Sequence, residues 1–180
     1  MAPLGSELER LFAPDYLDDL GGRSLDDLRS MRAECQHAET AVSYLRRVAQ
    51  GRLDIVQGIL EQQASGGADL SEIVEHLPSI IGSGPPRPAG PGRLPSQMAP
   101  DIEVDENLTA EIDGIFDAAR IGEMMDKPAD ELRAVAEELI AAEGRISHQR
   151  KALHERIDAL QAEIVSRYKS GQASPDGLLT

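Results

Sequence analysis

Apolar residues recur along one long segment of the first half of the chain, at alternating steps of four and three positions. They are Met31, Cys35, Ala38, Val42, Leu45, Ala49, Val56 and Ile59, and Arg52 fills the one gap in the series. This heptad spacing places the side chains on one seam of a helix, as in a coiled coil. With Ser24 as a suitable N-cap, it predicts a long helix over about 25–64.

A second segment with the same spacing lies in the other half of the chain. Its seam positions are Val135, Leu139, Ala142, Ile146, Gln149, Leu153, Arg156 and Leu160. Pro128 suits the first turn of a helix, and Gly171 stands beyond the last seam residue. The pattern predicts a second long helix over about 128–168.

Between the two segments lies a stretch that neither a helix nor a central strand tolerates. Nine of the 14 residues in 82–95 are Gly or Pro. We expect a disordered linker over 82–100, which separates a first helical repeat (1–81) from a second one (101–180) with a loose tail. A short helix near 70–77 and a solvated acidic arm at 101–106 are also predicted.

The two halves are copies of one another at a fixed offset of 104 residues. When 7–60 is placed on 111–164 without a gap, 13 of 54 positions are identical, including the only two Phe residues, Phe12 and Phe116. We interpret the chain as an internal duplication. The predicted fold class is all-α, a long antiparallel helical hairpin or coiled coil with short flanking helices. The paired Phe residues mark flanking segments, 1–20 and 101–125, that we expect to offer extra contacts to a partner.

Composition and charge exclude several classes of protein. The chain has 18 Lys and Arg against 32 Asp and Glu, a net charge of −14, which argues against direct DNA or RNA binding and against attachment to an anionic membrane. No apolar run approaches the roughly 20 residues that cross a bilayer. One Cys cannot form an internal disulfide. We therefore expect a cytoplasmic protein.

Many of the repeated residues are polar and lie beside the seam rather than on it. In the first copy they are Glu39, Ser43, Arg46, Gln50 and Asp54; in the second they are Glu143, Ser147, Arg150, His154 and Asp158. At this spacing five side chains share one helix stripe about 80° wide and about 22 Å long. Solvated pairs on a helix face explain one such stripe, but they do not explain its repetition in an unbroken register.

The residue types in the stripe suit a guanine nucleotide. A carboxylate accepts hydrogen bonds from the N1–H and N2–H edge of guanine, and Arg clamps a phosphate or the O6 and N7 edge. Ser and Gln complete contacts to phosphate or ribose. Two copies of the stripe indicate a ligand with repeated guanine units.

The repeated pattern E-x3-S-x2-R-x3-Q-x3-D resembles the RsiG family, the cyclic di-GMP-responsive anti-sigma factors of sporulating actinobacteria. The first copy matches fully, and the second departs only at His154. The resemblance implies that the ten stripe residues bind cyclic di-GMP, and we expect two molecules of this ligand. It also implies that the loaded protein holds a WhiG-type sporulation sigma factor away from RNA polymerase and promoter DNA. Falling ligand levels would then release the sigma factor.

Three other functions are possible for these residue types: a metal site, a cysteine nucleophile and a simple coiled-coil adaptor. Glu34 and His37 form half of a carboxylate-bridged metal site, but no second half exists, so we expect neither a metal nor an enzyme. Cys35 sits on the seam and is expected to be a small buried residue, not a nucleophile. The main alternative function is a ligand-independent coiled-coil adaptor. Arg52 and Arg156, both on seam positions, either pair with an acid or reach a ligand.

Overall fold

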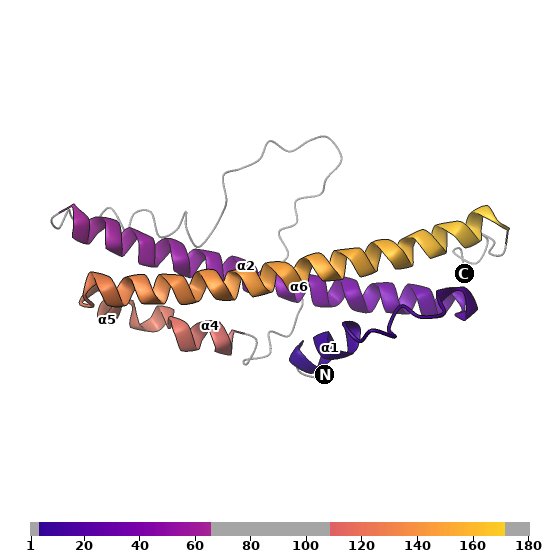
Figure 1. Cartoon of the computed structure of the whole chain (residues 1–180), viewed down its shortest axis with the longest axis horizontal. Coiled ribbons are helices and arrows are strands. Elements are labelled where there is room, and N and C mark those ends of the chain that lie inside the picture. Colours follow the sequence, from indigo (N-terminus) through magenta and orange to yellow (C-terminus); the bar gives the residue numbers. More distant parts are fainter. Residues whose placement is uncertain (1–3, 66–108, 172–180) are drawn as a thin grey trace. The chain divides into compact units, whose positions relative to one another are not determined.

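The computed structural model describes residues 4–65 and 109–171. Figure 1 labels the helices α1, α2, α4, α5 and α6. The first half contains α1 (Leu4–Leu11), the short 3-10 helix η1 (Leu20–Gly22) and α2 (Leu25–Ala64). The second contains α4 (Ala110–Ile115), η2 (Ala118–Arg120), α5 (Ile121–Met125) and α6 (Ala129–Lys169). All secondary structure in the described residues is helical, so the all-α fold class is confirmed. The expected linker, the helix near 70–77 and the acidic arm lie outside these residues.

The ends of the long helices follow local sequence signals. Ser24 and Asp27 form a reciprocal cap, in which the Asp27 amide donates to Ser24 Oγ at 3.1 Å and the Ser24 amide donates to Asp27 Oδ2 at 3.2 Å. At the C-terminal end of α6, Gly171 adopts a φ of 73° and its amide donates to the Tyr168 carbonyl. These caps satisfy backbone groups that a helix leaves without partners at its ends.

The repeat is visible in the helix boundaries. Adding the offset of 104 to α2 gives 129–168, and α6 spans Ala129–Lys169. The short helix α4 ends at Ile115, which is the copy of Leu11 at the end of α1. In each half a short helix is followed by a Phe and then leads into a long helix, as an internal duplication requires.

The chain forms two compact units that cut across the two repeats. The first unit joins the described parts of 1–44 and 146–180, and the second unit covers those of 45–145. Each unit therefore contains part of α2 and part of α6. This division follows from antiparallel pairing, because the beginning of one long helix then packs on the end of the other.

In the first unit α1 and η1 pack on the pair formed by α2 and α6. The buried side chains include the α1 residues Leu8 and Leu11 and the seam residues of both long helices, Leu28, Met31, Cys35, Ala38, Val42, Ile146, Leu153 and Leu160. Arg29 contacts Tyr168 and Arg32 contacts Gln161, so rising numbers on α2 meet falling numbers on α6. The seam predicted from the heptad pattern is therefore the core of this unit.

In the second unit α4 and α5 take the place that α1 and η1 have in the first. Its buried side chains are Ala49, Ile55, Val56, Ile59, Ile112, Phe116, Met124, Leu132, Ala136, Leu139 and Ala142. Gln63 at the end of α2 donates to the Lys127 carbonyl just before α6 at 2.8 Å. Phe116 is completely buried. Its ring belongs to the core of this unit, and whether the flanking segment also contacts a partner stays a prediction.

Arg52 and Arg156 tie the short segments to the long helices. In the second unit Arg52, whose side chain is only 11% exposed, pairs with Asp113 of α4. In the first unit Arg156 Nε donates to the carbonyl of Leu11, the last residue of α1, at 2.7 Å. Of the two roles left open by the sequence, pairing within the protein is the one the structure supports, though the Arg156 acceptor is a carbonyl rather than an acid.

Candidate functional site

The polar stripe residues form two clusters, one in each unit. The first cluster consists of Glu39 and Ser43 of α2 with Arg150 and His154 of α6. The second cluster consists of Arg46 and Gln50 of α2 with Glu143 of α6. Each cluster thus combines a glutamate from one copy of the motif with two residues of the other copy. These two are the arginine and the residue at the Gln/His position.

Glu39 is the centre of the first cluster. Its Oε1 accepts from Ser43 Oγ at 2.7 Å and from Arg150 Nε at 3.0 Å, and it lies 3.2 Å from His154 Nε2. The same Arg150 Nε is 3.1 Å from Ser43 Oγ. The Glu39 side chain is 20% exposed, so one carboxylate with three donors stands at the edge of the core, still open to solvent.

Glu143 occupies the corresponding place in the second cluster. Its Oε1 accepts from Arg46 Nε at 2.8 Å and from Gln50 Nε2 at 3.2 Å. Its side chain is 22% exposed, close to the value for Glu39. The two clusters are therefore chemically parallel, with Gln50 in the second where His154 stands in the first.

The surroundings of Glu39 keep its carboxyl group ionised. Burial raises the pKa of Glu39, but hydrogen bonds from Ser43 and Arg150, together with the positive charge nearby, more than offset this and leave the pKa lowered. A carboxylate in this state accepts hydrogen bonds only. It therefore suits a ligand edge that presents N–H groups.

The remaining stripe residues lie outside the two carboxylate-centred clusters. Asp54 and Asp158 are exposed, one turn beyond Gln50 and His154, and neither makes a hydrogen bond or ion pair with another described residue. Ser147 is half-buried on α6 within the first unit. The structure thus brings seven of the ten predicted residues into the two clusters and leaves the aspartates facing solvent.

What the sequence reasoning missed is the exchange of partners between the two copies. It placed each motif along its own helix, whereas the clusters join α2 to α6. In an antiparallel pair the numbers of facing residues have a constant sum, and Glu39 with His154 has the same sum as Gln50 with Glu143. The fixed offset between the repeats could have revealed that each glutamate pairs with residues of the other copy in a reciprocal way. It does not reveal which residues of α2 lie opposite which residues of α6.

The metal and thiol candidates of the sequence lie outside the clusters. The described residues contain no group of three or more His, Cys, Asp or Glu side chains that could hold a metal ion. Glu34 pairs with Arg10 at 2.9 Å, and burial raises the pKa of the Cys35 thiol, which disfavours the reactive thiolate. No helix in this part of the chain has the length and apolar character needed to span a membrane.

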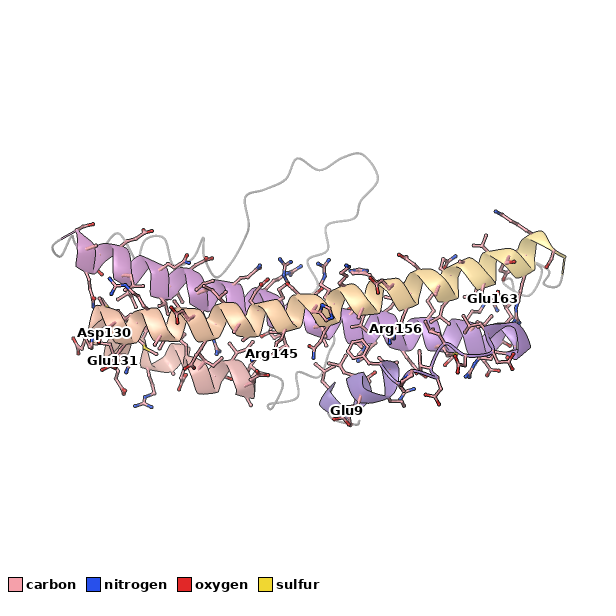
Figure 2. The ribbon with its side chains drawn as sticks, in the orientation of Figure 1. Glu9, Asp130, Glu131, Arg145, Arg156 and Glu163 are labelled. Carbon is pink, nitrogen blue, oxygen red and sulfur yellow. The ribbon has the colours of Figure 1, made fainter. Side chains whose placement is uncertain are left out.

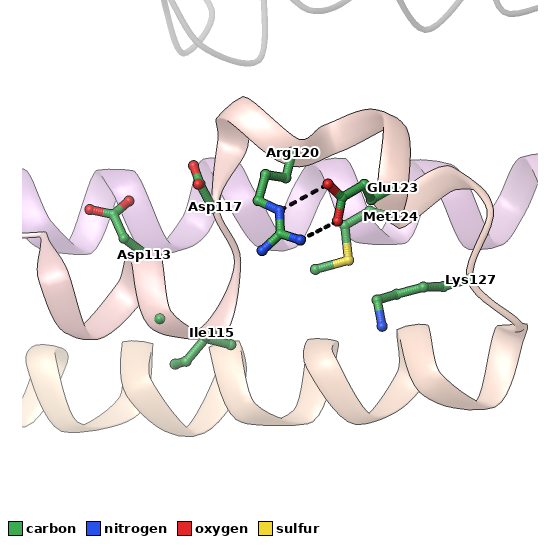
Figure 3. Close-up of a pocket in the computed structure, with 8 residues that line it drawn as sticks. Asp113, Ile115, Asp117, Arg120, Glu123, Met124 and Lys127 are labelled. Carbon is green, nitrogen blue, oxygen red and sulfur yellow. Dashed lines mark hydrogen bonds and ion pairs between the residues drawn. The ribbon is translucent and has the colours of Figure 1, made fainter.

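A polar pocket of about 240 Å³ lies in the second unit between α4, α5 and the start of α6 (Figure 3). Within it Arg120 makes two bonds to Glu123, at 3.0 and 2.5 Å, while Lys127 pairs with Glu131 at 2.7 Å. Asp113 accepts from Thr109 at 2.5 Å in addition to its pair with Arg52. Arg120 and Glu123 pair with one another, and Lys127 and Asp113 pair with Glu131 and Arg52 outside the lining, so this pocket is a weaker candidate than the two clusters.

Comparison with known proteins identifies one family. A family model described as RsiG-like matches residues 14–81 and 122–180, well over half of the chain. No curated protein matches the sequence. The matched ranges include both copies of the polar motif and both long helices.

Proposed function

Because the chain belongs to the RsiG-like family, we propose that it is an anti-sigma factor controlled by cyclic di-GMP. Membership in this family points to a regulatory protein with a sigma factor as its partner, and not to an enzyme. The proposal adds the ligand, which binds at the two clusters. It also adds the partner class, a WhiG-type sporulation sigma factor that the loaded protein holds away from RNA polymerase and promoter DNA.

The reciprocal pair of clusters carries the nucleotide part of the proposal. Glu39 and Glu143 are partly open carboxylates that could accept from the N1–H and N2–H edge of a guanine. Arg150 and Arg46 are 38% and 36% exposed, so their guanidinium groups are within reach of a ligand phosphate. Two clusters of one kind suit a ligand with two guanines and two phosphates, and we propose two ligand molecules per chain.

Each cluster draws on both long helices, and this links ligand binding to the hairpin. A ligand that replaces Arg150 as the hydrogen-bond partner of Glu39 remains in contact with α2 and α6 at once. Because such a ligand binds the paired helices and not the separated ones, it stabilises the folded hairpin. A stabilised hairpin is the surface that we propose the sigma factor recognises.

The charge of the protein supports a basic partner. With a net charge of −14, the chain attracts positively charged surfaces, and the DNA-facing regions of a sigma factor are basic. Complementary charge speeds association more than it strengthens the final complex. The same acidity repels an anionic nucleotide, which explains why the clusters need arginine.

Calorimetric titration with cyclic di-GMP tests the proposal. The purified protein, alone and with the sigma factor, is compared with the double variant Arg46→Ala/Arg150→Ala. A matched control is Arg47→Ala/Lys151→Ala, which removes two positive charges one residue farther along each helix, from exposed positions. We expect saturable binding near two ligands per chain for the wild type and the control, and none for the cluster variant.

The competing function, a ligand-independent coiled-coil adaptor, predicts a different result. In that case neither the wild type nor the control binds the nucleotide, with or without a sigma factor, although circular dichroism shows both to be helical. Equal loss of binding in the cluster variant and in the control would point to a general charge effect and would remove the clusters as the site.

A further inference from the structure

The two clusters differ in one donor, although the distance from that donor to the glutamate oxygen is the same. Gln50 Nε2 lies 3.2 Å from Glu143 Oε1, and His154 Nε2 lies 3.2 Å from Glu39 Oε1. The amide of Gln50 keeps its charge state at every pH, whereas an imidazole gains a proton between about pH 8 and pH 5. One cluster therefore contains an imidazole and the other an amide at the equivalent position.

We propose that His154 makes nucleotide binding at the first cluster dependent on proton uptake, while binding at the second cluster is independent of it. The inference rests on the function proposed above and adds to it an unequal response of the two sites. Under mildly acidic conditions the first cluster becomes the tighter site, and above neutral pH the two clusters become alike.

The groups that face the imidazole define the direction of this effect. From α2 the facing group is the carboxylate of Glu39. On α6 itself Arg150 lies one turn before His154 and Asp158 lies one turn after it. Burial raises the pKa of Glu39, but the hydrogen bonds from Ser43 and Arg150 outweigh burial and leave the pKa lowered. The group facing His154 is therefore an ionised carboxylate.

The rest of the charge is the same in both clusters. Each has one Glu and one Arg, with an Asp of the repeated motif one turn beyond the cluster, and only the further ionisable group, His154, differs. Protonation of His154 therefore adds one positive charge to the first cluster alone. Since the ligand carries two phosphate charges, the added charge favours its binding by about fivefold at a separation of roughly 8 Å in water.

Proton uptake during binding tests the inference directly. Cyclic di-GMP is titrated into the full chain at pH 6.5 in two buffers that differ in their enthalpy of ionisation, and the difference in heat gives the number of protons taken up. We expect uptake by the wild type, no uptake by His154→Gln and about twice the wild-type uptake by Gln50→His. Affinities at pH 6 and pH 8 are measured beside this and should differ by about fivefold only where a cluster histidine is present.

Both substitutions place at one cluster the residue that the other copy already has at the equivalent position, so folding should be preserved, and circular dichroism checks it. His37 and His148 stay in every variant and act as internal controls. Equal proton uptake by the wild type and His154→Gln, with binding intact, overturns the inference but leaves the proposed function in place. Absence of saturable binding in all three proteins removes the proposed function and the inference with it.

Discussion

The guanidinium carbon of Arg156 lies 4.9 Å from the centre of the Phe12 ring, while Arg156 Nε donates to the carbonyl of the preceding residue, Leu11. Figure 2 labels Arg156 on α6. A cation held over an aromatic face and bonded to the last carbonyl of a helix stabilises the contact between that helix and its neighbour. The arginine at this seam position therefore fastens the first short helix to the long pair.

Substitution Arg156→Ala should lower the free energy of unfolding by about 2 kcal/mol, because it removes the contact with Phe12 and leaves the Leu11 carbonyl without its donor. Urea titration followed by circular dichroism measures the effect. The control is Arg145→Ala, since Arg145 is 59% exposed and its partner Glu111 is 69% exposed, a pair expected to contribute little. A variant that keeps wild-type stability yet loses nucleotide binding would instead assign Arg156 to the ligand site.

The stability of the protein should depend on pH through Glu39. Its pKa is lower in the folded protein than the ordinary value of 4.5, so its contribution to stability is present above that value and is lost as the pH falls through the folded-state pKa. In Glu39→Gln this part of the acid dependence is absent. Unfolding free energies measured between pH 3 and pH 6 should converge for the two proteins at the acidic end. Parallel curves over the whole range would contradict the role given to the Glu39 cluster.

The cap of α2 provides a test of the helix start. Ser24→Ala removes the oxygen that accepts from the Asp27 amide, and a lost N-cap costs about 1 kcal/mol. Thermal unfolding measures the change. Ser30→Ala is the control, because Ser30 is exposed inside α2, where alanine is the better helix former. We expect a lower melting temperature for the first variant and an unchanged or slightly higher one for the second.

Two glycines of the second half should respond in opposite ways to alanine. An added methyl group at Gly144 in α6 meets nothing within 4 Å, so Gly144→Ala should stabilise the helix by about 0.5–1 kcal/mol. Gly171 has a φ of 73°, where a side chain is strained, so Gly171→Ala should cost about 1 kcal/mol. Both values follow from denaturant titration. A destabilising change at Gly144 would contradict the open surroundings that the structure gives this residue.

Sequence periodicity was enough to predict the long helices and the seam. The start of α2 at Leu25 and that of α6 at Ala129 lie within one residue of the positions expected from the caps and heptads. Helix formation depends on residues within a few turns of one another, and such short-range signals are legible in a sequence. Seam residues such as Cys35 and Leu153 are fully buried for the same reason.

The partners of the polar residues could not be predicted in this way. The sequence left Arg52 and Arg156 with two roles each, and only the packing of α4 and α1 supplied their partners, Asp113 and the Leu11 carbonyl. Nor did the sequence indicate that Phe116 of the flanking segment is completely buried. Whether a short amphipathic segment turns toward the core or outward depends on a surface that another part of the chain provides.

The sequence by itself determined an all-helical repeat protein with two polar stripes, because periodicity, caps and internal identity are properties of neighbouring residues. The tertiary structure decided that Glu39 meets Arg150, 111 positions away, and that Glu143 meets Arg46, 97 positions away. The physical reason is that the register between α2 and α6 minimises the packing energy of the whole seam. Glu39 also accepts from its own-helix neighbour Ser43, and that contact alone gives no sign of the register.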